Sequence, residues 1–545
     1  MVNVQIDGTW LQFPKGTKVI EACSQAQKFV PRYCYHPKLS TPGNCRMCLV
    51  EIGMPKMSPD RQPVLGPDGK PEIAWIPRPQ ISCAQEVSEG MGVRTDSPMV
   101  RECRQGVMEF LLINHPLDCP ICDQAGECRL QEFSVEYGQG QSRFLERKVK
   151  KPKNVELGPR VTLDAERCVL CSRCIRFMKE VAKDDVLGFV DRGSFSTIAC
   201  HPERTLDSNY SLNTVDICPV GALTSTDFRF KMRVWFLKET RTIDVNDGLG
   251  CNITVGAREN KVHRVTPREN NDVNGVWIPD SHRLNFKYLT DPERITEPQV
   301  KGQAVDWRSA VAIAADLIRS IPSSAAAVIG SARMTNEELF LCKNLIQTLG
   351  AGDRHDVVPR IGEPDGILIP ADRNPNTTGA VALGVAAPEP GSRLAAIAAG
   401  VRSGQIRLLV CFEDATLLGL TESELARCTI IATGILPNAT TRQAAVLFPA
   451  SGSFEKRGSM INIQNRLQRL NRAVQAPGQC RDDWEILRDL AVALGSSQKP
   501  STLEEVFAKM ASEHPAFAGL NLGKIGDLGI PLAGISAAPA TATLS

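Results

Sequence analysis

The sequence predicts a chain of two unlike parts: an α+β part up to about residue 240, then an α/β part built on a parallel sheet. Two observations support this. Of the 19 cysteines, 15 fall before residue 252, and many of them form tight clusters between short strand and helix patterns. In the second part, which is rich in Ala, Leu, Val and Ile, buried strand patterns alternate with helix patterns, as in doubly wound sheets.

In the first part the chain opens with a strand and a turn at Asp7-Gly8. Seven prolines between residues 53 and 79 predict a surface excursion, because proline cannot donate to a sheet. Residues 100–113 place apolar side chains largely on one helical face, and Pro116 ends that helix.

In the second part, buried strands are expected at residues 325–331, 406–412 and 429–432. Helices are expected from a capping box at Thr335 to about residue 349, and at residues 483–494.

Composition excludes several classes of protein. Hydrophobic residues make up 42% and charged residues 23%, which is typical of globular domains. A net charge of +2 and 5% aromatic residues disfavour nucleic-acid binding. We expect neither a membrane span nor a secretory signal. The cysteines are therefore more typical of metal ligands than of disulfides.

The first cysteine cluster is Cys34-x10-Cys45-x2-Cys48-x34-Cys83. Plant-type ferredoxins also combine an approach loop, a tight Cys-x2-Cys and a distant fourth cysteine. The preceding strand, turn and helix fit a ferredoxin-like β-grasp domain. The pattern therefore indicates a [2Fe–2S] site, although four thiolates also suit zinc.

The second cluster is His115-x3-Cys119-x2-Cys122-x5-Cys128. Three thiolates and an imidazole suit either structural zinc or a [4Fe–4S] cube, and the pattern lacks the second histidine pair of a zinc finger. His115 alone would be an ordinary residue at a helix end. Its place four residues before a cysteine trio makes it a candidate ligand.

The third cluster is Cys168-x2-Cys171-x2-Cys174 with Cys218-Pro219 further along. Close turns of this kind wrap three corners of a cube, and we expect Cys218 to complete the same [4Fe–4S] site because no second such trio exists. Arg173 and Arg176 flank the trio and are interpreted as solvated surface rather than as groups that offset cluster charge.

The other cysteines are isolated. Cys342, Cys411 and Cys428 lie in apolar runs and are expected to be small buried hydrophobes. Cys200 and Cys251 are left open as residues that could touch a cluster.

Three stretches, residues 33–48, 109–122 and 167–177, resemble the large iron–sulfur subunit of respiratory complex I. This family comprises the G subunit of bacterial NADH-quinone oxidoreductase and the mitochondrial 75 kDa subunit. The resemblance covers about residues 1–290. Beyond that the chain resembles the molybdopterin-oxidoreductase fold, notably at residues 454–462 and 483–487.

The resemblance implies an α+β N-terminal part, with a β-grasp [2Fe–2S] ferredoxin-like domain and [4Fe–4S] ferredoxin-like domains, followed by an α/β molybdopterin-oxidoreductase-like domain. The expected domains are residues 1–97 ([2Fe–2S]), 98–145 ([4Fe–4S] with one His and three Cys ligands), 146–235 ([4Fe–4S]), 236–530 (reduced molybdopterin-oxidoreductase-like) and a flexible tail, 531–545.

The implied function is electron transfer in proton-translocating NADH-quinone oxidoreductase. The family's ligands carry over to Cys34, Cys45, Cys48 and Cys83 for one [2Fe–2S] cluster. They carry over to His115, Cys119, Cys122 and Cys128, and to Cys168, Cys171, Cys174 and Cys218, for two [4Fe–4S] clusters.

The chain is expected to act as a subunit of the enzyme, without catalytic residues, molybdenum or nucleic acid of its own. The resemblance implies that FMN and NADH bind to a partner subunit, and that other subunits of the peripheral arm are partners as well. Membrane association would come only through the complex, on the cytoplasmic face of a bacterial inner membrane. Neither GxGxxG after a strand nor a P-loop is present, which agrees with a nucleotide site elsewhere.

The sequence departs from the family in two respects. Some bacterial members hold a further [4Fe–4S] cluster through Cys-x2-Cys-x3-Cys and a distant cysteine, whereas the equivalent stretch here, residues 242–251, keeps only Cys251. That cluster should be absent. The terminal domain is expected to be reduced.

Alternatives are an iron–sulfur subunit of an NAD-linked formate dehydrogenase or hydrogenase, a diaphorase subunit of a soluble hydrogenase, and a zinc-stabilised structural protein. A formate dehydrogenase or hydrogenase subunit would need further clustered cysteines. A diaphorase subunit would end after the third cluster. A zinc-stabilised protein would lack iron.

Overall fold

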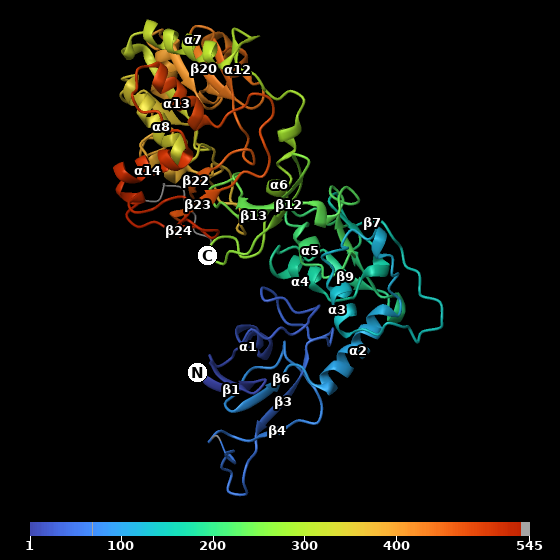
Figure 1. The fold of residues 1–545 in the computed structure, drawn as a ribbon. Helices are drawn as coiled ribbons and strands as arrows, with labels where there is room; N and C mark the ends of the chain where they lie inside the picture. Colours follow the sequence, from blue (N-terminus) through green and yellow to red (C-terminus); the bar gives the residue numbers. More distant parts are fainter. Residues whose placement is uncertain (68, 536–545) are drawn as a thin grey trace. The chain divides into compact units, whose positions relative to one another are not determined.

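The computed structural model describes residues 1–67 and 69–535. The chain divides into two compact units, Met1–Phe236 and the part from Leu237 onward (Figure 1). Each unit is built from its own strands and helices.

The first unit begins with a mixed sheet whose strand order is β2-β1-β6-β3-β4, with β5 paired to β3. Its elements are β1 (Val2–Ile6), β2 (Thr9–Phe13), α1 (Val19–Gln25), β3 (Leu49–Pro55), β4 (Ile73–Trp75), β5 (Gln80–Ile81) and β6 (Met91–Arg94). Strands β1 and β6 run parallel, and α1 buries Val19 and Ile20 in the same core as the strands. This is the expected β-grasp arrangement.

The turn between β1 and β2 matches its prediction. Asp7 and Gly8 have φ values of 47° and 87°, so both lie in the left-handed region that a two-residue hairpin turn favours. Asp7 also accepts hydrogen bonds from the backbone N–H and the hydroxyl of Thr95, 2.7 Å each. The turn therefore fastens the start of the chain to the end of β6.

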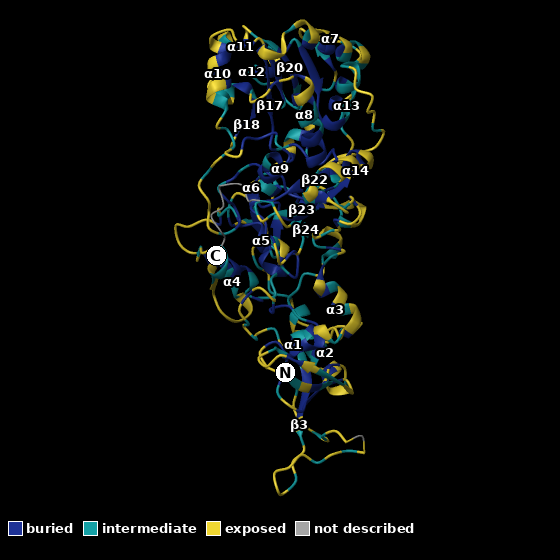
Figure 2. Cartoon of the chain, turned by 90° about the vertical axis from the view of Figure 1, so that its left-hand side faces the viewer, coloured by how far each residue is buried: buried dark blue, intermediate teal, exposed yellow. Residues whose placement is uncertain are grey.

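The proline-rich excursion lies between β3 and β4. Residues 56–72, apart from residue 68, which lies outside the described residues, are mostly exposed, and Figure 2 shows their loops in yellow beyond the end of β3. The interpretation as a surface excursion is confirmed.

The rest of the first unit consists of short elements joined by loops. They are α2 (Pro98–Leu112), α3 (Arg129–Tyr137), β7 (Val155–Glu156), β8 (Val161–Leu163), α4 (Arg173–Glu180), β9 (Leu187–Val190), β10 (Thr197–Cys200), α5 (Asn213–Asp216) and β11 (Leu223–Ser225). The helix predicted at residues 100–113 is α2, which begins two residues earlier because Ser97 caps it by accepting from Val100 N. Strands β11, β8 and β7 form one antiparallel sheet, and β9 and β10 form a hairpin.

The second unit opens with an antiparallel sheet and a short helix: β12 (Lys238–Ile243), β13 (Asn252–Arg258), β14 (Lys261–Pro267) and α6 (Asp280–Arg283). Its main sheet has the order β16-β15-β21-β20-β19-β17-β18 and is parallel from β21 to β18. These strands are β15 (Gln299–Val300), β16 (Gln303–Ala304), β17 (Ala326–Gly330), β18 (His355–Val357), β19 (Leu408–Cys411), β20 (Thr429–Gly434) and β21 (Val446–Pro449).

Two separate apolar clusters cover the faces of this sheet. Val328 of β17 packs into one cluster, and its neighbours Ala327 and Ile329 pack into the other, as alternation along a strand requires. The helices of the unit are α7 (Trp307–Ser320), α8 (Asn336–Thr348), α9 (Thr377–Ala382), α10 (Leu394–Arg402), α11 (Glu422–Leu425), α12 (Ala439–Arg442), α13 (Asp483–Ala493) and α14 (Leu503–Glu513). The predicted doubly wound parallel sheet is confirmed.

A last antiparallel sheet contains β22 (Gly458–Ile461), β23 (Arg466–Leu470) and β24 (Ile530–Pro531). The tail predicted at residues 531–545 thus starts within β24, and Leu532 N still donates to Asn465 O at 2.8 Å. Residues 536–545 of that tail lie outside the described residues. Among the described residues, no helix has both the length and the apolar character needed to cross a membrane.

The capping box of α8 allows a test of what stabilises the second unit. Thr335 Oγ1 accepts from Glu338 N, and Glu338 Oε2 accepts from Thr335 N at 2.7 Å, in a fully buried setting. Thr335→Ala should cost about 1–2 kcal/mol, because the helix loses the acceptor for an N–H that water cannot reach. The midpoint of thermal unfolding, followed by circular dichroism, should fall.

Thr421→Ala is the matched control, since Thr421 makes the same box on the short, exposed helix α11. It should have a smaller effect. An equal loss of stability in both variants would contradict the role given to burial.

Candidate metal centres

The first candidate site gathers four cysteines from three segments of the β-grasp domain. Cys34, Cys48 and Cys83 are almost completely buried, and Cys45 is half-buried. Hydrogen bonds from the thiols of Cys45 and Cys83 lower the pKa of Cys34, and a hydrogen bond from Cys83 lowers that of Cys48. The four thiols therefore interact pairwise, Cys45 and Cys83 with Cys34, and Cys83 with Cys48.

Local backbone geometry explains how the sequence brings these sulfurs together. Gly43 and Arg46 have φ values of 65° and 61°, so the loop turns sharply on both sides of Cys45. Cys48 stands immediately before β3, and Cys83 follows β5, which pairs with β3. The sheet therefore carries the tight Cys-x2-Cys and the distant cysteine to the same end.

The second candidate site is a cavity of about 70 Å³ whose lining includes all four predicted residues, His115, Cys119, Cys122 and Cys128. His115 follows the end of α2, and Cys128 directly precedes α3. Burial lowers the pKa of His115 to about 4. The imidazole is therefore neutral at pH 7, and a ring nitrogen has a lone pair free for a metal.

An ion pair supports this cavity from one side. Asp118 lines the cavity, and its two carboxylate oxygens accept from Arg167 Nε at 3.1 Å and Nη2 at 2.8 Å. Lys153 Nζ adds a third contact at 2.8 Å. Burial opposes the charge of Asp118, but these donors hold its pKa below the usual range.

The third candidate site is a smaller cavity, about 20 Å³, lined by Cys168, Cys171, Cys174 and Cys218. Leu170 and Ser172 have φ values of 53° and 60°, which wind the chain tightly between the cysteines. Leu170 N donates to Cys168 Sγ at 3.4 Å, as expected where backbone N–H groups face sulfur ligands.

The surface interpretation of Arg173 and Arg176 is wrong. Arg176 is only 9% exposed and donates to Cys34 O at 2.5 Å and to Cys171 O at 3.5 Å. Arg173 donates to Tyr35 O at 2.7 Å and to Ile217 O at 3.0 Å. Both arginines therefore join the first site to the third, a contact across about 140 residues of chain that local sequence does not reveal.

The remaining cysteines differ in their burial and surroundings. Cys342 and Cys411 are fully buried in the two clusters that cover the main sheet, as expected, whereas Cys428 is only half-buried. Cys200 Sγ donates to Leu157 O at 3.4 Å. Cys251 is fully buried at the end of the loop between β12 and β13.

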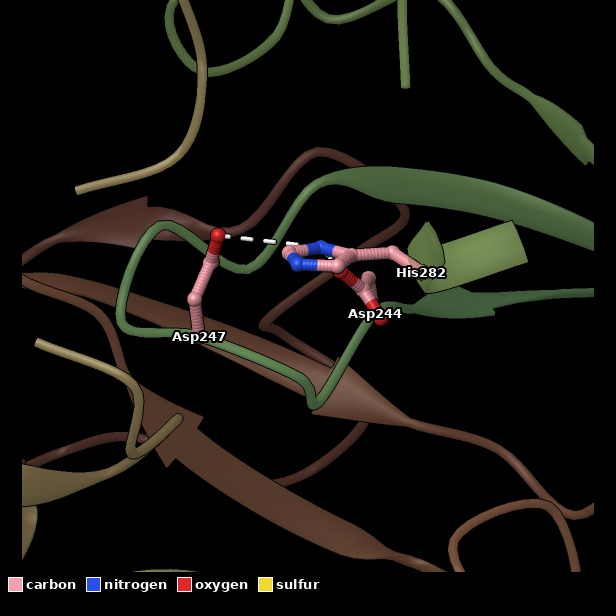
Figure 3. Close-up of side chains that lie close together, drawn as sticks. All are labelled: Asp244, Asp247 and His282. Atoms are coloured by element: carbon pink, nitrogen blue, oxygen red, sulfur yellow. Dashed lines mark hydrogen bonds and ion pairs between the residues drawn. The ribbon is translucent and has the colours of Figure 1, made fainter. Parts of the chain in front are cut away.

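Sequence reasoning missed a fourth group, Asp244, Asp247 and His282, whose ligand atoms lie within 4.8 Å of one another (Figure 3). The one signal available was Asp-x2-Asp, which ends four residues before Cys251. His282 comes from a separate segment, so spacing alone could not add it.

Family models match five parts of the chain. In order, they are a 2Fe-2S iron-sulfur cluster binding domain (residues 1–98), the NADH-ubiquinone oxidoreductase-G iron-sulfur binding region (104–143), the ferredoxin-like domain of NADH-quinone oxidoreductase subunit 3 (158–224), the NDSU1/NuoG-like 4Fe-4S domain of NADH-ubiquinone oxidoreductase (237–287) and molybdopterin oxidoreductase (389–493). The predicted fold class is confirmed.

Curated relatives carry matching names. The chain is 41% identical over 357 residues to the G subunit of NADH-quinone oxidoreductase from Rickettsia felis, covering 65% of this chain and 50% of that protein. It is 41% identical over 358 residues to the mitochondrial NADH dehydrogenase (ubiquinone) iron-sulfur protein 1 of Solanum tuberosum, covering 65% and 45%. The 75 kDa subunit of NADH-ubiquinone oxidoreductase from Reclinomonas americana is 40% identical over 357 residues, covering 64% and 48%.

The chain thus spans about half the length of the curated relatives it matches. Among solved structures, a chain of an NAD+-reducing [NiFe]-hydrogenase aligns with a TM-score of 0.35 and 26% identity, over 43% of this chain and 91% of that one. The relatives and family models together confirm the resemblance: the chain is a homologue of the large iron–sulfur subunits of NADH-quinone oxidoreductase and carries 2Fe-2S and 4Fe-4S binding domains.

Proposed function

We propose that this chain is an electron-transfer subunit of a proton-translocating NADH-quinone oxidoreductase, passing electrons from a partner that oxidises NADH at FMN towards quinone. The observation that carries this proposal is the convergence of three separate ligand sets in one unit, in domains similar to those of complex I subunits. The names of the relatives favour this function over a formate dehydrogenase or hydrogenase subunit.

We assign the ligand sets as follows. Cys34, Cys45, Cys48 and Cys83 would hold a [2Fe–2S] cluster, and each of the other two sets, His115 with Cys119, Cys122 and Cys128, and Cys168 with Cys171, Cys174 and Cys218, would hold a [4Fe–4S] cluster. Bound clusters supply one-electron redox chemistry. The thiolate and imidazole donors fit these groups, and most of the assigned cysteines are buried.

Contacts between the sites support an order in which the third site lies between the other two. Asn44, beside Cys45, donates to Leu170 O at 3.1 Å, and Arg176 bridges Cys34 O and Cys171 O. On the other side, Arg129 N, next to Cys128, donates to Pro219 O, next to Cys218, at 3.2 Å. We propose that electrons pass from the first site to the third and then to the second.

The proposed domains are residues 1–97, 98–145, 146–235 and 236–530. The last would be a molybdopterin-oxidoreductase-like cover without molybdenum, because its cysteines are not clustered. Partners would be the NADH- and FMN-binding subunit and other subunits of a peripheral arm, on the cytoplasmic face of a bacterial membrane.

The full-length chain, reconstituted anaerobically with iron and sulfide, tests the function. It should hold about ten iron atoms, from one two-iron and two four-iron clusters. Dithionite should reduce it, as seen by EPR. NADH should not reduce it unless the partner that binds FMN is added.

Two results would contradict this proposal. Oxidation of NADH by the isolated chain would place a flavin or nucleotide site in it, and zinc in place of iron would remove the redox function. About fourteen iron atoms per chain would show a further cube and overturn the assignment of three clusters.

Gly221 provides a test of the second site. A Cβ at this position would stand 2.3 Å from Cys122 Sγ, so a side chain must displace that sulfur. Gly221→Ala should therefore lose about four iron atoms per chain while the [2Fe–2S] signal persists. Iron analysis and EPR would measure both.

Gly106→Ala is the control, because a Cβ at that position in α2 meets nothing within 4 Å. Its iron content should be unchanged. A Gly221→Ala protein with full iron content and an unaltered spectrum would show that Cys122 is not a ligand.

The role of His115 can be tested by two substitutions. His115→Cys could preserve a cube with four thiolates, and the added negative charge should lower its reduction potential, since imidazole ligands raise it in Rieske centres. His115→Ala should leave an open iron site that loses iron or binds an outside ligand. Redox-poised EPR would follow both, with the [2Fe–2S] signal as internal reference; unchanged spectra and potentials in both variants would exclude His115 as a ligand.

A further inference from the structure

The part of the chain that matches a 4Fe-4S domain, residues 237–287, does not have the ligands for a cube. It contains one cysteine, Cys251. Cubes of this kind are held by four ligands that are mainly cysteine thiolates. Asp244 and Asp247 stand at the spacing of Cys-x2-Cys-x3-Cys that ends at Cys251. The donors at these positions are therefore carboxylates rather than soft thiolates.

Asp244, Asp247 and His282 converge on one point. Asp244 Oδ2 lies 2.7 Å from His282 Nδ1, and Asp247 Oδ2 lies 3.7 Å from the same atom. Figure 3 shows both carboxylates directed at the imidazole, which comes from α6 while the aspartates come from the loop between β12 and β13. The group thus joins two separate segments.

One carboxylate oxygen of this group accepts no hydrogen bond from the described residues, although it lies 3.7 Å from His282 Nδ1. Asp247 is fully buried, and its Oδ1 accepts from Leu249 N at 2.9 Å. Its Oδ2 has no hydrogen-bond partner among the described residues. An unpaired carboxylate oxygen in a dry interior is costly. Because this oxygen faces His282 and lies close to Asp244, it faces the place a shared cation would occupy.

The loop that carries the aspartates is held firmly. Gly248 N donates to Asp372 O at 3.0 Å, and Asn462 and Gln468 donate through their side chains to Leu249 O and Gly250 O at 2.9 Å each. Asn462 and Gln468 are buried. The two carboxylates are therefore placed by the surrounding fold before anything binds to them.

Two nearby arginines, Arg333 and Arg373, direct their hydrogen bonds to backbone oxygens rather than to these carboxylates. Arg333 donates to Val245 O at 3.4 Å, and Arg373 donates to Glu363 O at 2.6 Å. Among the described residues, neither arginine forms an ion pair with Asp244 or Asp247.

We propose that Asp244, Asp247 and His282 form a structural binding site for one divalent cation of the zinc or manganese class. Metal–ligand distances of about 2.0–2.2 Å place ligand atoms roughly 3–3.5 Å apart, close to the separations seen. Two carboxylates balance a double charge, and the imidazole favours transition metals over calcium or magnesium. The cation would fasten the β12–β13 loop to α6, and water would complete its coordination.

Manganese is the best probe for the full chain with its iron–sulfur clusters in place, because Mn2+ binds thiolates weakly. Free Mn2+ gives a room-temperature EPR signal that is lost on binding. Titration of the oxidised protein should show one Mn2+ bound per chain, and Zn2+ should displace it, as the order of metal affinities requires. Binding of either metal should also raise the midpoint of thermal unfolding.

Asp247→Asn and His282→Gln should each weaken Mn2+ binding by at least about 100-fold, since even outer contacts of a metal site cost up to that much. Asp316→Asn, on the exposed face of α7, is the matched control and should bind as the original chain does. Circular dichroism would confirm that each variant is folded. If Asp247→Asn does not fold, the Mn2+ affinity of His282→Gln tests the proposal.

Absence of Mn2+ and Zn2+ binding to the original chain would overturn the proposal and leave a hydrogen-bonded ionic cluster. Equal binding by His282→Gln and the original chain would overturn it as well. These outcomes are independent of the proposed electron transfer, because the iron content and the cluster EPR signals are measured on the same samples.

Discussion

The first unit depends on one constraint, the crowding of cysteine thiols at three candidate sites that are largely buried. Thiolates placed side by side repel one another, and burial raises the pKa of thiols such as Cys128, Cys168 and Cys171. The fold offsets this cost with positive charge, because Arg176 and Arg167 are buried among the sites. The short strands and helices around them are too small to be stable on their own.

Local spacing predicts most of the side chains that the structure brings together in each candidate site. Cys-x2-Cys fixes the geometry of a turn, and the left-handed residues Arg46, Leu170 and Ser172 are where such turns bend. What spacing cannot predict is how one set meets another. Arg173 and Arg176 resemble surface residues because a basic side chain on a short helix usually is one. Only the approach of Cys34 and Tyr35 from far along the chain buries them.

In the second unit, too, some elements can be predicted from their own residues, whereas others are recognisable only by their contacts with distant segments. Its main strands are predictable within a few residues because a strand buried on both faces is a continuous apolar run, as at β17 and β19. Strands with only two or three residues, such as β15 and β24, carry no such pattern and escape prediction. The predicted tail is too long for that reason, since β24 is recognisable only by its pairing with β23.

In the group formed by Asp244, Asp247 and His282, the backbone fold directs the side chains at one point, whatever their polar atoms are. The loop is held by its hydrogen bonds to Asn462 and Gln468, and these contacts involve backbone oxygens rather than the carboxylates themselves. Two carboxylates there need positive charge more than two thiols would, because aspartate is ordinarily ionised at pH 7 and a free thiol is not. His282 lies against both carboxylates, but the Oδ2 atom of Asp247 still accepts no hydrogen bond from the residues that the structure describes.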